Sequence, residues 1–102
     1  MIELLDARSD AIADACKTHG VARLDVFGSA ARGDHGSEAR DVDLLVEFVP
    51  MPPTELADAY FGLLDELRSI IALPVDLVMH DAIRNAYVRA SIDRDRRMLY
   101  AA

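Results

Sequence analysis

Residues 26–48, VFGSAARGDHGSEARDVDLLVEF, decide the fold. An apolar stretch ends at a Gly-Ser pair, a loop of small and charged residues follows, and two aspartates then introduce a second apolar stretch. Burying a carboxylate costs several kcal/mol unless the group is paired or bound to a metal. Aspartates in a strand-like segment therefore indicate a functional site.

The two aspartates are Asp41 and Asp43, and on a strand they point to the same face, with α-carbons about 6.6 Å apart. Leu45 and Glu47 are expected to accompany them on that face. Two convergent carboxylates without histidine or cysteine suit a hard cation such as Mg²⁺, which also takes water and phosphate oxygens. The opposite, buried face is predicted to carry Val42, Leu44, Val46 and Phe48.

A third carboxylate, Asp76, interrupts the apolar segment PVDLVM at residues 74–79. If this segment pairs beside the second strand, Asp76 completes a cluster of three acids. Three carboxylates around two metal ions are typical of phosphoryl or nucleotidyl transfer.

The loop before the aspartates suits phosphate binding. Gly28 ends the first strand, Ser29 offers a hydroxyl and a helix cap, and the two following alanines let backbone N–H groups approach a phosphate closely. Arg32 is a candidate phosphate clamp. The loop has neither the lysine of a Walker P-loop nor a G-x-G-x-x-G dinucleotide fingerprint.

The hydrophobic pattern predicts one compact α/β (α+β) domain over residues 1–102, with a small mixed sheet and helices packed against it. The predicted order is α-β-β-α-β-α. The predicted elements are a helix over 3–18, strands over 21–27 and 41–49, a helix over 54–72 capped by Thr54, a strand over 73–79, a helix beginning at Asp81, and an extended end, RRMLY.

Composition narrows the class of protein. An apolar fraction of 52% and a charged fraction of 28% are ordinary for a globular chain. No apolar run is long enough to cross a bilayer, and the N-terminus lacks a signal-peptide pattern, so we expect a cytoplasmic protein without a membrane partner. The net charge of -7 disfavours direct nucleic-acid binding.

Single residues outside the motif have simpler interpretations. Cys16 is expected to be a small core residue, and the histidines 19, 35 and 80 to lie at the surface. From Asp81 onward, five arginines stand against three aspartates. Such a basic tail is more commonly a solvated charged helix. The alternative is that its arginines contact an acidic group.

The segment FGSAARGDHGSEARDVDLLVEF, together with PVDLVM and the helix between them, resembles the minimal nucleotidyltransferases of the DNA polymerase β-like superfamily. The resemblance implies that Gly28 and Ser29 hold the triphosphate and that Asp41 and Asp43 bind two Mg²⁺ ions. It also implies that Asp76 binds the metal nearer the attacking hydroxyl and helps to activate it.

Stand-alone members of this size resemble antitoxins whose partner is a HEPN-domain ribonuclease toxin. The implied reaction transfers AMP from ATP to a toxin tyrosine and neutralises the toxin. Two departures leave an alternative open: eleven residues separate Ser29 from Asp41, one more than usual, and Arg40 stands where the family often has a serine. The alternative is an antitoxin with a decayed site that acts by binding alone.

Overall fold

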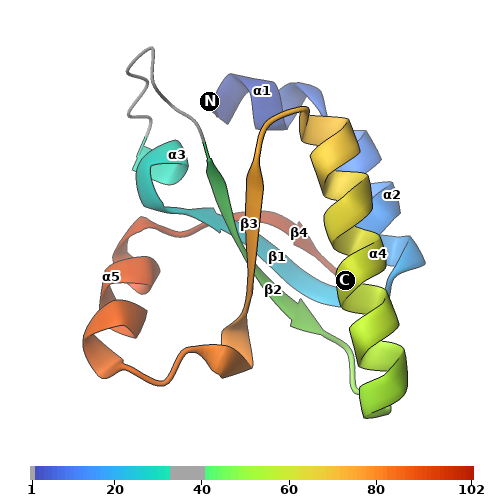
Figure 1. The fold of residues 1–102 in the computed structure, drawn as a ribbon. Coiled ribbons are helices and arrows are strands. Elements are labelled where there is room, and N and C mark those ends of the chain that lie inside the picture. The colour runs from blue at the N-terminus through green and yellow to red at the C-terminus, as the bar shows by residue number, and fades with distance from the viewer. Residues whose placement is uncertain (1, 33–40) are drawn as a thin grey trace.

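The fold is a four-stranded sheet with helices on both faces, in a computed structural model that describes residues 2–32 and 41–102 (Figure 1). The strand order is β3-β2-β1-β4. Strands β1 (Val21–Phe27) and β2 (Val42–Phe48) are antiparallel, as are β1 and β4 (Arg97–Ala101), whereas β3 (Val75–Met79) runs parallel to β2. The prediction of a small mixed sheet with packed helices is confirmed.

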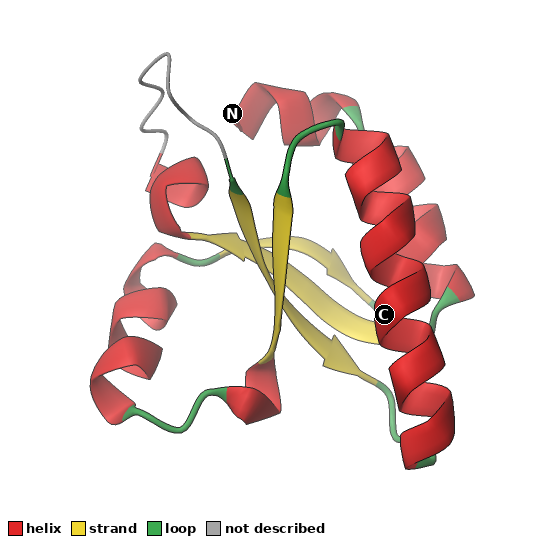
Figure 2. Ribbon diagram, viewed as in Figure 1, coloured by secondary structure: helices red, strands yellow, loops and turns green. Residues whose placement is uncertain are grey.

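Helices α1 (Ile2–Ala7), α2 (Ser9–Thr18) and α4 (Pro53–Ile71) gather on one side of the sheet, and α5 (Ala86–Asp95) lies on the other (Figure 2). Two short helices join the layers: α3 (Gly28–Arg32) follows β1, and the 3-10 helix η1 (His80–Ala82) follows β3. No helix in the described part of the chain has the length and apolar character needed to cross a membrane.

The main core lies between the sheet and the pair α2 and α4. Val42, Leu44 and Val46 of β2 are all at most 1% exposed, which confirms three of the four residues predicted for the buried face. The fourth, Phe48, is only half-buried. Cys16 is also fully buried, as expected.

Leu45 shares the face of the aspartates, as predicted, but the expectation that this face is an outer surface is wrong at Leu45. It is 2% exposed, and Ile92 of α5, at 8%, is also buried. Neither belongs to the main core cluster, so some apolar side chains are also buried on the side of the sheet where α5 lies. Apolar burial on this face therefore adjoins the strand ends that carry the aspartates.

The predicted single helix over 3–18 is two helices, because the chain turns at Arg8. The backbone there has φ -110 and ψ 14. The Arg8 N–H donates to the Leu5 carbonyl at 3.2 Å, and the Ile12 N–H donates to the Arg8 carbonyl at 3.0 Å. The turn lets Leu5 and Ile12, both at most 1% exposed, reach the same core from differently directed helices.

The start of α4 also differs from the prediction, since Thr54 does not cap it. Pro52 is the N-cap and Pro53 is the first helical residue. Proline is favoured at that position because its missing N–H would have no partner in the helix, and its fixed φ suits the first turn.

The last helix begins later than the predicted Asp81, which lies in η1. Asn85 caps α5, and its side-chain oxygen accepts hydrogen bonds from the N–H groups of Tyr87 at 2.8 Å and Val88 at 3.2 Å. The extended end predicted from RRMLY is confirmed as β4, which forms one edge of the sheet.

Candidate active site

The three predicted aspartates lie at one end of the β2–β3 pair. Asp43 of β2 is the direct register partner of Asp76 of β3, and Asp41 precedes β2 by one residue. Paired strands lie about 4.8 Å apart, so register partners present their side chains side by side on one face. Asp43 is half-buried, while Asp41 and Asp76 are exposed.

These carboxylates are close enough to repel one another. Partial burial raises the pKa of Asp43, and the negative charges of Asp76 and Asp41 raise it further. A divalent cation would relieve this repulsion. Across residues 2–32 and 41–102, however, no three His, Cys, Asp or Glu side chains lie close enough together to hold a metal ion by themselves.

The three carboxylates still fit a Mg²⁺ ion if a bound ligand supplies part of the coordination shell of the ion. Mg²⁺ commonly takes only one or two carboxylates from a protein and completes its octahedron with water and substrate phosphates. Asp43 with either neighbour provides that number of oxygen ligands. The chemistry of the site therefore suits a metal that arrives together with a nucleotide.

Gly28 packs directly against Asp43. Its φ is +70, which disfavours any residue with a side chain, and a β-carbon built there would stand 2.7 Å from the Asp43 Oδ2 atom. Phe27, the residue before it, is the register partner of Asp43. Glycine is required here both for its backbone conformation and for space, so the turn after β1 lies against the aspartates.

The short helix α3 fixes this turn in the fold. Ala30 and Ala31 are 2% exposed and belong to the main core cluster, while Ser29 is half-buried beside Gly28. The side chain of Arg32, at the end of α3, lies outside the described part of the chain. So do Arg40 and the remainder of the loop at 33–40, where the extra residue was predicted.

Asp25 is a charged residue whose importance the strand pattern did not reveal. Its side chain is fully buried on β1 opposite Leu45. Arg23 Nε donates to both of its oxygens, at 3.1 and 3.0 Å, and Arg96 Nε donates to Oδ2 at 2.7 Å. The only sequence signal was an aspartate within an apolar strand.

The basic tail is partly structural and partly solvated. Arg96 bonds to Asp25 and to Asp93, so the acidic contact exists within the chain. Arg94 and Arg97 are exposed.

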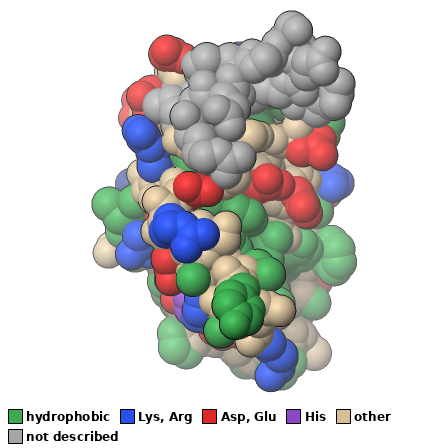
Figure 3. All heavy atoms as spheres, turned by 90° about the vertical axis from the view of Figure 1, so that its left-hand side faces the viewer, with side chains coloured by type: hydrophobic (Ala, Val, Ile, Leu, Met, Phe, Trp, Pro, Cys, Tyr) green, Lys and Arg blue, Asp and Glu red, His purple; other side chains and the backbone are tan. Residues whose placement is uncertain are grey.

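On the face that includes α3 and α5, acidic side chains gather mainly in the upper half, with basic and hydrophobic ones below (Figure 3).

A mixed sheet with a Gly-Ser turn packed against strand-borne aspartates defines the class of nucleotidyltransferases. Residues 9–99 match the family model of the nucleotidyltransferase domain. The chain belongs to this family of enzymes.

Relatives and solved structures that are similar to this chain carry nucleotidyltransferase names as well. "Putative protein adenylyltransferase MJ0128" of Methanocaldococcus jannaschii is 39% identical over 75 residues, which is 74% of this chain and 72% of the relative. A solved structure described as a "putative minimal nucleotidyltransferase" is 31% identical, with a TM-score of 0.67, and the match covers 93% of this chain and 92% of that one.

A more distant neighbour shows the same fold. It is a structure of tri-AMPylated Shewanella oneidensis HEPN toxin in complex with MNT antitoxin, with 16% sequence identity and a TM-score of 0.65. The match covers 96% of this chain and 73% of that one.

Proposed function

We propose that this protein is a Mg²⁺-dependent antitoxin that transfers AMP from ATP to a tyrosine of a HEPN ribonuclease toxin and thereby neutralises it. The observation that carries the proposal is the position of Asp43, which faces Asp76 across the β2–β3 pair and packs against Gly28. Relatives named as protein adenylyltransferases and neighbours that are MNT antitoxins support the choice of substrate and partner.

In this proposal, the turn after β1 binds the triphosphate, and the aspartates at β2 and β3 bind the metal ions and act on the hydroxyl. Gly28 and Ser29 hold the triphosphate, because the turn that they form lies directly against the Asp43 carboxylate and so places a bound phosphate next to the metal ligands. Asp41 and Asp43 would hold the metal ions, and Asp76 would bind the metal nearer the attacking hydroxyl and help to activate that hydroxyl. The bound Mg²⁺ would offset the triphosphate charge and lower the pKa of the hydroxyl.

The reaction is an in-line displacement. The tyrosine oxygen forms a bond to the α-phosphorus of ATP, and the bond from that phosphorus to the oxygen bridging to the β-phosphate breaks. Pyrophosphate leaves with the electron pair, and in this proposal the Asp76 carboxylate accepts the hydroxyl proton. The product is a tyrosine esterified with AMP.

The direct test incubates the protein with Mg²⁺, ATP labelled on the α-phosphate, and the toxin encoded beside its gene. We expect label on the toxin, lost with Asp43→Asn, Asp76→Asn or a chelator, and kept with Asp65→Asn, an exposed carboxylate on α4. Absence of label with the wild-type protein, or equal label with Asp43→Asn, contradicts the transfer reaction. Toxin neutralised in cells by Asp43→Asn supports the binding-only antitoxin instead.

A further inference from the structure

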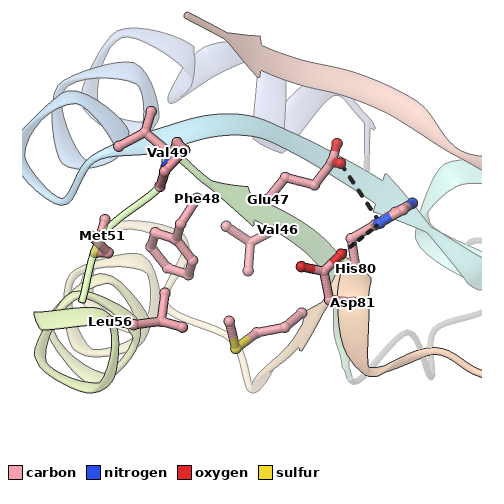
Figure 4. Close-up of a pocket in the computed structure, with 10 residues that line it drawn as sticks. Val46, Glu47, Phe48, Val49, Met51, Leu56, His80 and Asp81 are labelled. Carbon is pink, nitrogen blue, oxygen red and sulfur yellow. Dashed lines mark hydrogen bonds and ion pairs between the residues drawn. The ribbon is translucent and has the colours of Figure 1, made fainter. Parts of the chain in front are cut away.

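A pocket of about 240 Å³ lies at the other end of β2, away from the aspartates. Phe48, Leu56 and Met79 are among its apolar lining residues, and Glu47 and Asp81 supply two carboxylates. In the close-up, Leu56, Phe48 and Val46 lie to one side and the Asp81 carboxylate points toward them (Figure 4). The described residues that line it include no lysine or arginine.

The pocket forms where β2 extends beyond the end of β3. β3 ends at Met79, which is paired with Val46, whereas β2 continues to Phe48. Beyond Val46, β2 has β1 on one side and, among the described strands, none on the other. An unpaired strand edge can accept an extended peptide through its backbone groups.

The two carboxylates of the pocket have unused capacity to accept hydrogen bonds. Arg89 Nη1 lies 3.1 Å from His80 Nε2. Because a guanidinium only donates, Nε2 accepts and the ring proton is on Nδ1. That single N–H faces Asp81 Oδ1 at 3.5 Å and Glu47 Oε1 at 3.6 Å, distances too long for strong hydrogen bonds.

An apolar groove of about 270 Å³ continues from the pocket along α4. It shares Leu56 and Met79 with the pocket and adds Tyr60 and Phe61, and the Phe61 side chain is 63% exposed. The surface therefore places an acidic pocket with apolar walls next to a mainly apolar groove.

We propose that this surface docks an extended segment of a partner protein that carries an arginine or lysine followed by an apolar residue. The aliphatic stem lies on Leu56 and Met79, and the apolar residue packs against Phe61. The cationic end lies beside His80, where the Asp81 and Glu47 carboxylates both face the imidazole. Charge complementarity selects a basic occupant. The pocket is smaller than the roughly 300 Å³ usual for drug-sized ligands, which favours a single side chain over a cofactor.

The test uses two blocked peptides on the full-length protein without nucleotide, so it is independent of the transfer reaction. They are acetyl-Val-Arg-Val-Leu-amide and the same peptide with citrulline, the uncharged isostere, in place of arginine. Amide NMR shifts are expected at Glu47, Leu56 and Met79. We expect the citrulline peptide to bind about fivefold more weakly, as suits two partly exposed ion pairs.

A variant pair gives a second readout. Glu47→Gln combined with Asp81→Asn should bring arginine-peptide binding down to the citrulline level, whereas Asp65→Asn should leave it unchanged. Equal binding of both peptides to the wild-type protein, shifts confined to other surfaces, or no saturable binding would overturn the proposal. The peptide-binding result does not depend on whether the protein transfers AMP to a toxin, so the two proposals can fail separately.

Discussion

Arg96 donates hydrogen bonds from Nε and Nη2 to the Asp25 carboxylate, although 71 positions separate the two residues. The Asp25 side chain is fully buried and that of Arg96 is 15% exposed. Burial by itself lowers the pKa of Arg96, but the hydrogen bonds and charges of Asp25 and Asp93 outweigh it and raise that pKa. The pair fastens the junction of α5 and β4 to the centre of the sheet.

Replacing Asp25 with alanine should therefore be strongly destabilising. The change leaves Arg96 largely buried without its main partner, and breaking a buried pair in this way costs about 3 kcal/mol. Urea unfolding followed by circular dichroism measures the loss. Asp93→Ala is the control, because the Asp93 side chain is 54% exposed and its pair with Arg96 should contribute less than about 1 kcal/mol. Equal losses for both variants would contradict this assignment.

Gly28→Ala should abolish toxin labelling. The new β-carbon would stand 2.7 Å from Asp43 Oδ2 and displace the carboxylate. Gly20→Ala is the matched control, because Gly20 also has φ +70 but its nearest neighbour is the flexible end of Met51, at 3.0 Å. Both variants should lose about 1 kcal/mol of stability from backbone strain, whereas only Gly28→Ala should lose activity. An active Gly28→Ala protein would argue against a role for this turn.

Asp43→Asn should make the metal-free protein slightly more stable at neutral pH. Asp43 and Asp76 are directly opposite each other, and removing a like-charge pair gains about 0.5 kcal/mol. Because the pKa of Asp43 is raised on folding, the folded state binds more protons, so this repulsion weakens as the pH falls. The difference in unfolding free energy from the wild type should therefore shrink in acid. A variant less stable than the wild type at pH 7 would contradict this.

Mg²⁺ together with a non-hydrolysable ATP analogue should raise the unfolding temperature of the wild-type protein. A ligand that binds only the folded state stabilises it by mass action. Asp43→Asn should respond much less, and Mg²⁺ without nucleotide should have a small effect, because the described residues do not close a metal site by themselves. A large effect of Mg²⁺ alone would indicate a preformed metal centre.

Cys16 should resist thiol reagents in the native protein. Burial raises the pKa of its thiol to about 12, and the side chain is fully enclosed. At pH 8 only about one thiol in ten thousand would be the reactive thiolate, even with access. Colour development with a disulfide reagent should be slow in buffer and fast in concentrated urea. Rapid reaction of folded protein would show that helix α2 opens locally.

Short-range patterns predicted much of this molecule. The alternation in 21–27 and 41–49 located β1 and β2, and the apolar stripe after the prolines located α4. The buried set Val42, Leu44 and Val46 followed directly, because one face of a strand must be apolar if it packs on helices. Helix ends were less predictable, since the break at Arg8 and the start of α5 at Asn85 depend on local capping and on how neighbouring helices reach the core.

The sequence by itself determined the family resemblance and the three candidate acids, because a Gly-Ser turn, Asp-x-Asp and a later strand aspartate are written locally in the chain. Only the tertiary structure decided which groups lie together. Strand pairing set Asp43 opposite Asp76 and against Gly28, and packing buried Leu45 on the face that the aspartates share. The same packing joined Asp25 to Arg96. These relationships link residues far apart in sequence, and their energies exist only after the sheet has formed and excluded water.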